Sequence, residues 1–306
     1  MANILSFIRK PAPAHGEHAT LAALLRGFSI EVMPRSAARI PDFRAILPAG
    51  ARVYVAHIDG TETADMVATC RRLVDEGFAA MPHVPARGLA TRAELDARLG
   101  AYASVGVREA LAIAGGIDRV RGPFPDSISM LETGLFDAHG FARIHVAGHP
   151  EGNRDIDPSG GEQAVMDALR RKNVFRSRTD AAMAIVTQFA FEPDPVIAWA
   201  ERLRAKGVTL PIHIGVAGPA KLQTLIKFAM SCGVGASLRV LQRRAADLSN
   251  LILPFEPTEM LTALARHKVA HPDCLIEAVH LFPLGGITAA TDYAGAALAT
   301  PVRARA

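Results

Sequence analysis

The stretch Ala184-Ile185-Val186-Thr187-Gln188-Phe189-Ala190-Phe191-Glu192-Pro193 decides how the rest of the chain is interpreted. It begins as an apolar run that favours a strand, stops on the polar pair Thr187 and Gln188, and is followed by a helical pattern from Pro195. A strand of a parallel sheet that is buried on both faces has such a near-continuous apolar run. The polar pair is therefore either an ordinary strand exit or part of a site at the end of the sheet.

Seven further runs have the same strand-like form, and helical patterns separate most of them. In chain order the eight runs span 28–32, 52–57, 79–83, 110–114, 143–149, 184–188, 210–215 and 278–282. Alternating strands and helices indicate a parallel sheet, and eight such units in 306 residues indicate an α/β protein of the (β/α)8 TIM barrel class. The alternative, an open doubly wound sheet, usually has a glycine-rich phosphate turn after an early strand, and Gly115-Gly116 is too weak a match.

The chain is predicted to form a single domain with an N-terminal helix. A leader and a helix from Glu17 to Arg26 occupy residues 1–27, and the helix ends at Gly27 because glycine favours helix termination. The barrel spans 28–295, and a flexible tail spans 296–306. The predicted barrel helices span 63–76, 91–105, 128–133, 162–172, 195–206, 219–231, 237–249 and 257–268.

Composition excludes several classes of protein. The net charge is +4 with a pI near 9.2, but the arginines are spread through helical segments, so no nucleic-acid footprint is predicted. No segment approaches the roughly 18 apolar residues that span a membrane. Cys70, Cys232 and Cys274 are too widely spaced for a metal site or a disulfide framework. We expect a cytoplasmic protein whose mild positive field helps to capture an anionic ligand.

In a barrel of this kind the active site lies at the carboxyl ends of the strands. Several residues that can bind or titrate fall at these ends and are expected to share one rim: Glu31, His57, His83, Gly115, Gly116, His149, Gln188, the 215–218 turn and Phe282.

Each of these residues has a chemical interpretation and a structural alternative. If Glu31 faces the barrel mouth, burial raises its pKa and makes it a proton donor; otherwise it lies on the surface. Gln188 offers a donor and an acceptor together, which suits a pterin, flavin or nucleobase edge, or it caps the strand. No two of the histidines lie at a common ligand spacing, so they are expected to bind a cofactor or substrate, not a metal. A structural role stays open for His57.

Several short motifs occur in the order found in one known family. The best match is the 185–192 motif, Ile-Val-Thr-Gln-Phe-Ala-Phe-Glu, and the others span 28–34, 81–83, 106–113, 215–219 and 280–282. On these motifs the chain resembles the methylenetetrahydrofolate reductase family over nearly the whole barrel. The resemblance implies a TIM barrel that binds FAD and interconverts 5,10-methylenetetrahydrofolate and 5-methyltetrahydrofolate with NADH or NADPH. Tetrahydrofolate and the nicotinamide are then its partners, and a homo-oligomer is expected.

The resemblance also implies roles for individual residues. Glu31 resembles the acid that opens the methylene bridge, and Gln188 the residue that contacts the pterin and, at another stage, the nicotinamide. Leu222 and Phe282 complete the implied substrate-binding set. The implied cofactor-binding residues are Ala56, His57, His83, Ile113, Ala114, Gly115, Gly116, His149, Asn153, Asn173 and Arg176.

The chain departs from the family pattern at charged positions. The family's Leu-Arg-Gly-Asp after the fourth strand is Ile113-Ala114-Gly115-Gly116 here, so its arginine and catalytic aspartate are absent, and Asp118 is a shifted substitute. His149, Ser177, Leu222 and Gly286 stand where the family has tyrosine, lysine, phenylalanine and arginine. Each lost charged contact to the cofactor phosphates weakens binding by roughly 1.5–3 kcal/mol. A flavin-independent folate reductase and a non-catalytic folate-binding barrel are therefore the alternative hypotheses.

Overall fold

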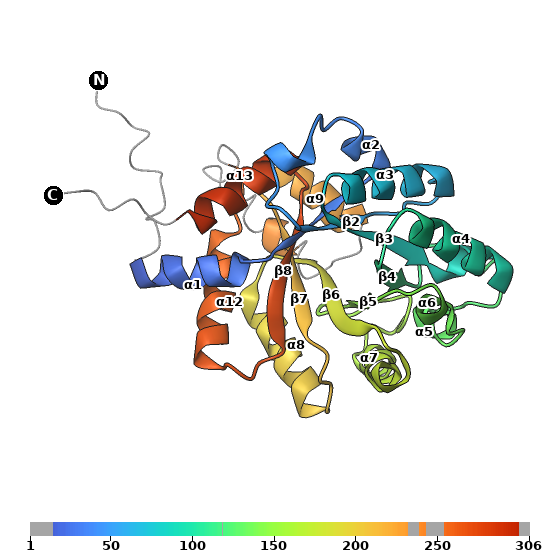
Figure 1. Cartoon of the computed structure of the whole chain (residues 1–306). Helices are drawn as coiled ribbons and strands as arrows, with labels where there is room; N and C mark the ends of the chain where they lie inside the picture. The colour runs from blue at the N-terminus through green and yellow to red at the C-terminus, as the bar shows by residue number, and fades with distance from the viewer. Residues whose placement is uncertain (1–14, 118, 232–238, 243–253, 300–306) are drawn as a thin grey trace, which may run out of the picture.

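The structure is a computed structural model of the chain that describes residues 15–117, 119–231, 239–242 and 254–299. Within these residues, eight parallel strands close into a barrel in chain order, with β8 paired to β1 (Figure 1). The predicted (β/α)8 barrel is confirmed. The strands are β1 Ser29–Val32, β2 Arg52–Val55, β3 Ala79–Pro85, β4 Glu109–Ile113, β5 Arg143–Gly148, β6 Ala182–Ala190, β7 Ile212–Ala217 and β8 Ile276–Phe282.

Each predicted run is a strand, with shifts at its ends. The β7 run, for example, was expected from Leu210, and the strand begins at Ile212. Proline has no amide N–H to give to a ladder, so Pro211 lies outside the strand, although its carbonyl accepts the amide of Ile185 at 2.8 Å.

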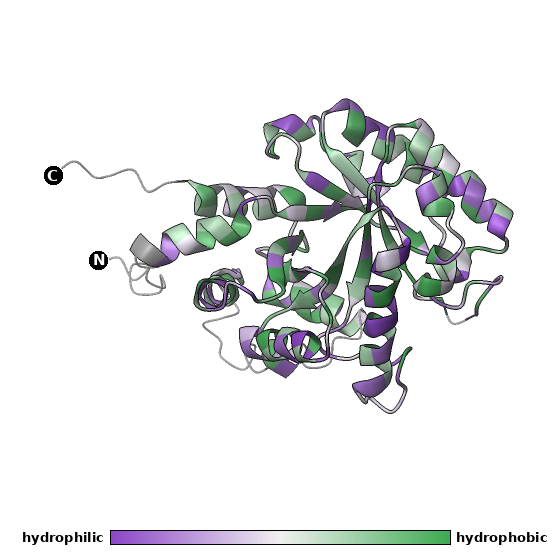
Figure 2. Cartoon of the chain, turned by 60° about the horizontal axis from the view of Figure 1, so that its bottom comes forward, coloured by the Kyte–Doolittle hydropathy of each residue, from purple (hydrophilic) through white to green (hydrophobic). Residues whose placement is uncertain are grey.

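Helices surround the strands on all sides (Figure 2). They are α1 His15–Leu25, α2 Pro34–Ala37, α3 Thr63–Asp75, α4 Arg92–Ser104, α5 Ser127–Leu131, α6 Leu135–Ala138, α7 Gln163–Phe175, α8 Pro193–Ala205, α9 Leu222–Ser231, α12 Thr258–Ala270 and α13 Ile287–Leu298. Short 3-10 turns are η2 Phe43–Ala45, η3 Ala86–Gly88 and η4 Arg176–Arg178. No helix in these described ranges is long and apolar enough to cross a membrane.

The C-terminal helix α13 was not predicted. It continues through Gly295 to Leu298, so residues 296–298 are helical where a tail was expected. Alanine has the best helix propensity, and Ala290, Ala294 and Ala297 form its buried face. The predicted leader (1–14), the end of the predicted tail (300–306), most of the predicted 237–249 helix, Asp118 and Cys232 lie outside the described residues.

The N-terminal helix α1 lies outside the barrel and packs against α12 and α13 (Figure 1). Leu21, Leu24 and Leu25 are its buried residues. The chain then turns at Gly27, whose φ of 76° is a left-handed conformation that glycine adopts without strain, and enters β1. The predicted helix followed by a glycine stop is therefore correct.

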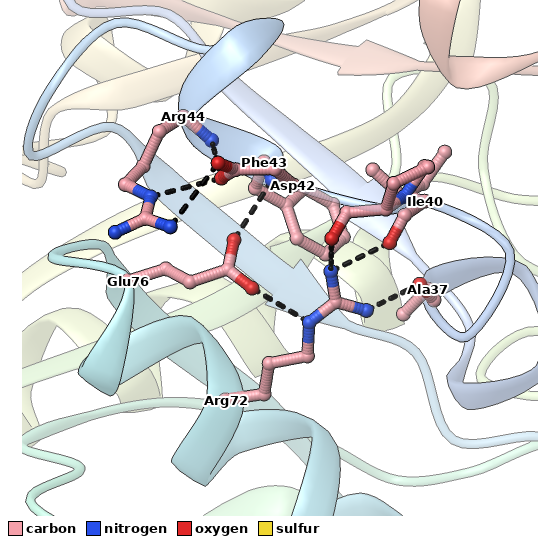
Figure 3. A network of polar contacts seen from close by, with 8 residues as sticks. Ala37, Ile40, Asp42, Phe43, Arg44, Arg72 and Glu76 are labelled. Atoms are coloured by element: carbon pink, nitrogen blue, oxygen red, sulfur yellow. Dashed lines mark hydrogen bonds and ion pairs between the residues drawn. The ribbon is translucent and has the colours of Figure 1, made fainter.

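The connection from β1 to β2 contains only α2 and η2, and α3 holds it in place (Figure 3). Arg72 of α3 donates to the carbonyls of Ala37 and Ile40 at 2.9 and 2.6 Å, and its guanidinium lies 5.0 Å from the centre of the Phe43 ring. Glu76 pairs with Arg72 at 2.6 Å and accepts the amide of Phe43 at 2.8 Å. This network fixes the segment that leaves the end of β1, where Glu31 lies.

Candidate functional site

Glu31 and His83 meet at the carboxyl ends of β1 and β3. Glu31 Oε2 lies 3.2 Å from His83 Nε2 and 4.0 Å from His280 Nε2 of β8. The side chain of Glu31 is 20% exposed, so it faces the mouth and not bulk water. His83 Nε2 is buried, and it has no hydrogen-bond partner among the described residues. Glu31 and His83 are therefore in close contact without a hydrogen bond, and a ligand can rearrange this contact.

The expected direction of the Glu31 pKa shift was wrong. Burial does raise the pKa of this carboxyl, as anticipated, but the interactions with His83 and the charge of His280 outweigh burial and lower the pKa. The sequence showed the apolar run around Glu31 but not the two imidazoles that converge on it. Near neutral pH Glu31 is thus a carboxylate, which accepts a proton before it can donate one.

A bulge in β6 directs Gln188 into the mouth. The pairing of β6 with β7 shifts register between Val186 and Phe189, and the hydroxyl of Thr187 fills the gap by accepting the amide of Gly215 at 2.8 Å. A Cβ atom on Gly215 would lie 2.3 Å from the carbonyl oxygen of Thr187, so only glycine fits. The side chain of Thr187 therefore stabilises the bulge, and the side chain of Gln188 lines the site.

Gln188, His149 and Asn153 line a pocket at the ends of β5 and β6. Its volume is about 220 Å³, which is below the roughly 300–1,000 Å³ of pockets that enclose whole drug-sized ligands, so it suits one ring or a side chain of a ligand. Asn153 Nδ2 lies 3.4 Å from the His149 ring nitrogens. Burial and, to a smaller extent, the charge of Lys172 lower the pKa of His149 to about 4, so His149 is neutral at pH 7.

The two implied substrate residues Leu222 and Phe282 have different environments. Leu222 is 5% exposed and belongs to an apolar cluster under the β6–β7–β8 side of the mouth. Phe282 ends β8 half-buried, with its ring centre 5.4 Å from that of Phe189 and 4.8 Å from that of His280. Phe282 is therefore placed to offer a ring face to a ligand, whereas Leu222 supports the wall behind it.

The predicted cofactor residues after β2 and β4 lie at the same rim. Ala56 continues the β1–β2 ladder by donating to Val32 at 2.8 Å, and His57 follows it half-buried, with a pKa lowered by burial and by nearby Arg98. After β4, Ala114 accepts the amide of Arg87 at 2.9 Å. Gly115 has a φ of 93° and packs against Pro85, and a Cβ on Gly116 would meet nothing within 4 Å. Ile113 belongs to a small apolar cluster of inward-facing strand residues.

Asn173 and Arg176 are not part of this rim. Asn173 Oδ1 accepts the amide of Thr209 at 2.8 Å, and Arg176 donates to the Thr209 hydroxyl at 3.2 Å. Thr209 precedes β7, so both residues lie at the amino ends of the strands, opposite Glu31 and Gln188. Their expected contact with a cofactor at the mouth is wrong, because α7 and η4 run to residue 178 and carry these positions down to the far end.

Lys172 is a residue that the sequence interpretation missed. It is 8% exposed, and its Nζ donates to the carbonyl of Ala147 in β5 at 3.0 Å. Burial lowers its pKa to about 8, against the opposing effect of Asp126. The described part of the chain offers Lys172 no salt-bridge partner within 4.0 Å, which is uncommon for a buried lysine. Its position near the end of a long helical pattern gave no signal in the sequence, since only the packing of α7 on β5 buries it.

The barrel interior contains a second set of missed residues. Ser29, Tyr54, His145, His213 and His280 are each buried, at positions where TIM barrels usually have branched apolar residues. His280 accepts or donates a hydrogen bond with Ser29 at 2.9 Å, and His145 does so with Tyr54. The available signal was a polar residue inside an apolar strand, as in Ile212-His213-Ile214 and Val279-His280-Leu281.

The described residues hold no group of three or more His, Cys, Asp or Glu side chains that could bind a metal ion. Cys70 and Cys274 are free thiols. Burial raises the pKa of Cys70, which makes it an unreactive core residue.

Two solved structures match the chain to different degrees. One is described as an uncharacterized protein from Clostridium thermocellum that binds two copies of 5-methyl-5,6,7,8-tetrahydrofolic acid, with a TM-score of 0.57 and 8% identity over 90% of this chain and 96% of that chain. The other is phosphonopyruvate hydrolase, with a TM-score of 0.38 and 13% identity over 84% of this chain and 98% of that chain. The first likeness is a likeness of fold, and the second is too distant to carry an argument.

A sequence model of one family matches more than half of the chain. The match covers residues 39–246, from the segment after β1 to the segment before α12, and its description is methylenetetrahydrofolate reductase. It includes His83, the β5–β6 pocket and the Thr-Gln bulge, while Glu31 and His280 lie outside it. The chain therefore belongs to the methylenetetrahydrofolate reductase family.

Proposed function

We propose that this protein interconverts 5,10-methylenetetrahydrofolate and 5-methyltetrahydrofolate, with a reduced or oxidised nicotinamide as the other substrate. The observation that carries the proposal is the shared rim of Glu31, His83 and Gln188, residues from β1, β3 and β6 of a barrel whose family acts on this folate pair. The folate-binding protein of the same fold supports a folate ligand at the mouth.

The proposed chemistry divides between these residues. Gln188, with a donor and an acceptor on one amide, orients the pterin edge, and the partly exposed Phe282 offers a face for a ring. Glu31, once protonated, gives its proton to the bridge nitrogen of methylenetetrahydrofolate as the carbon–nitrogen bond breaks. The resulting iminium carbon accepts a hydride, and the methyl group forms. In the reverse direction Glu31 accepts the proton.

The residues present do not fit FAD in the way that the resemblance implied. Asn173 and Arg176 are at the opposite end of the barrel, and Ala114 and Gly116 replace the charged pair after β4. Of the implied cofactor residues that remain at the mouth, the titratable ones are histidines, and burial lowers the pKa of both His57 and His149. The diphosphate of FAD thus has few cationic side chains to bind among the implied cofactor residues at the mouth. These observations favour the flavin-independent reductase, in which the folate and the nicotinamide meet directly.

The test is a visible absorption spectrum of the purified protein, followed by an assay of folate reduction. A colourless purified protein that oxidises NADH or NADPH with methylenetetrahydrofolate, and forms methyltetrahydrofolate, supports the flavin-independent form. A yellow protein that bleaches with the nicotinamide and recolours with the folate supports the flavin-dependent form. Folate binding without turnover under any electron donor contradicts the reductase and leaves the folate-binding barrel.

Glu31→Gln separates binding from chemistry. We expect the variant to bind folate and to lose turnover by about 10²–10⁴-fold, the usual contribution of a general acid. The matched control is Glu62→Gln, because Glu62 is an exposed carboxylate that follows β2 and makes no side-chain cap bond. Equal turnover in Glu31→Gln and Glu62→Gln would remove Glu31 from the mechanism.

A further inference from the structure

A continuous set of polar side chains runs through the barrel from the mouth to the opposite end. At the mouth, Glu31 Oε2 lies 4.0 Å from His280 Nε2. At the opposite end, Glu277 is the second residue of β8, and its side chain is 54% exposed to solvent. Polar side chains thus lie between the carboxylate of Glu31 at the mouth and that of Glu277 at the far end. The folate chemistry proposed above does not use these intervening side chains.

The upper half of the set runs from His280 to His145. The Nδ1 atom of His280 is 2.9 Å from the hydroxyl of Ser29. Ser29 and Tyr54 both contact the ring of His280, so His280 brings these two hydroxyl-bearing side chains together. The ring of Tyr54 also lies 4.3 Å from that of His280, and its hydroxyl bonds His145 Nδ1. Two of these contacts, Ser29–His280 and Tyr54–His145, are hydrogen bonds between groups that can exchange a hydrogen.

The lower half runs from His145 to Glu277. The ring centres of His145 and His213 are 4.7 Å apart, with an interplanar angle of 82°. Each ring has one buried nitrogen, Nε2 of His145 and Nδ1 of His213, that has no hydrogen-bond partner among the described residues, so the rings are in contact without a hydrogen bond between these atoms. The other nitrogen of His213 bonds Glu277 Oε2 at 2.8 Å. An unpaired buried polar atom is unfavourable, so two that belong to adjacent rings call for a functional explanation.

We propose that this set is a proton relay that connects solvent at the amino ends of the strands with Glu31 at the mouth. The proposal rests on the proposed folate chemistry. In the reductive direction a proton from water adds to one end and another leaves the opposite end, each imidazole accepting on one nitrogen and releasing from the other, so only N–H and O–H bonds change. The path is Glu277, His213, His145, Tyr54, Ser29, His280 and Glu31. The Glu277–His213, His145–Tyr54 and Ser29–His280 steps are hydrogen bonds, and side-chain rotations close the other three steps during transfer.

The relay would supply Glu31 with the protons that the reduction consumes. Glu31 rests as a carboxylate, because its imidazole neighbours lower its pKa against the effect of burial, yet the reduction consumes one proton per turnover. A folate and a nicotinamide that fill the mouth also exclude water from it, so proton entry from the far end keeps Glu31 supplied while both are bound. Buried histidines with pKa values far below neutral, such as His280 at about 3, stay uncharged and pass a proton without holding it.

The experiment uses Glu277→Gln, because Glu277 lies far from the mouth and is largely exposed. We expect kcat for methylenetetrahydrofolate reduction to fall by about tenfold or more, with an altered solvent isotope effect and an unchanged KM. The matched control, Asp273→Asn, removes a 71%-exposed carboxylate that bonds Arg204 at 2.7 Å just before β8, and it should leave kcat unchanged. Equal kcat in the two variants would overturn the relay.

A second measurement does not depend on activity. In ¹H–¹⁵N spectra of the full-length protein, Glu277→Gln should shift the ring nitrogens of His213 and also those of His145, whereas Asp273→Asn should shift neither. A change confined to His213 would show that the rings are not coupled and would refute the relay. If the wild type reduces no folate, the proposed function fails, and the spectra still decide whether the set transmits a proton change.

Discussion

Replacing Lys172 by methionine should stabilise the protein at neutral pH. Lys172 is buried, and its Nζ donates one hydrogen bond, to the carbonyl of Ala147 at 3.0 Å. Burial, its largest perturbation, lowers its pKa from 10.5 to about 8. The folded protein therefore binds this proton less tightly than the unfolded chain does. The resulting destabilisation begins as the pH falls below the unfolded-state pKa and is complete below the folded-state pKa.

The size of the effect follows from the two pKa values. A group with a pKa of 10.5 unfolded and about 8 folded destabilises the protein by about 3.3 kcal/mol at pH 7 and by about 1.4 kcal/mol at pH 9.5. Methionine fills a similar volume and removes this opposition, but it also removes the bond to Ala147, which contributes about 1 kcal/mol. We expect a net gain of about 2 kcal/mol at pH 7 that disappears by pH 9.5.

Urea unfolding at pH 7 and pH 9.5 measures both values. The matched control is Lys206→Met, because Lys206 is exposed at the end of α8 and its loss should change stability by less than about 0.5 kcal/mol. Parallel pH curves for the wild type and Lys172→Met would refute the reasoning, since they would mean that Lys172 keeps its ordinary pKa. Lys172 lowers the stability of the protein, and its charge acts on His149 at the mouth. A residue that lowers stability at such a place is consistent with a role in the site.

Three further predictions concern the segments that hold the site. Arg72→Ala should lower the free energy of unfolding by about 2–4 kcal/mol, because several hydrogen bonds to the segment after β1 are lost, while the exposed Arg71→Ala should be neutral in the same urea titration. Gly215→Ala should reduce folate affinity measured by calorimetry more than Gly295→Ala does, because a Cβ at 215 would lie 2.3 Å from the β6 bulge carbonyl and displace Gln188; equal affinities would contradict that account. The folded-state pKa of Glu31 is lowered, so its stabilising contribution is fully present above about pH 4.5 and is lost as pH falls through the folded pKa; Glu31→Gln should show a shallower acid unfolding curve, and an unchanged curve would refute this.

Most of the fold was predictable because the strands carry their own signal. Apolar runs such as 184–188 and 143–149 are buried on both faces, and they alternate with amphipathic helices, so the barrel and its rim follow from the pattern. The shared rim of Glu31 and His83 also followed, since both lie near the carboxyl ends of strands in one closed parallel barrel, whereas their direct contact did not. Helix α13 did not, because an alanine-rich stretch that contains Gly295 resembles a tail until its packing partners are known.

The site was less predictable because its chemistry depends on neighbours that are distant in the chain. Asn173 and Arg176 were placed by matching positions to a family pattern, and the length of α7 and η4 carries them to the wrong end of the barrel. The buried environment of Lys172 also depends on how α7 packs on β5. The misplacement of Asn173 and Arg176 and the missed burial of Lys172 have the same cause. In both cases the sequence shows the residue type but not where the helix positions the side chain in the barrel.

By itself the sequence determined the eight-stranded barrel, the folate family and the identity of the mouth residues, because these depend on periodicity and on local motifs. Only the tertiary structure decided the protonation state of Glu31 and the buried polar set that leads from it to Glu277. A pKa and a chain of hydrogen-bonding groups depend on the distances between side chains that closure of the sheet brings together, and those distances are not encoded in any one segment.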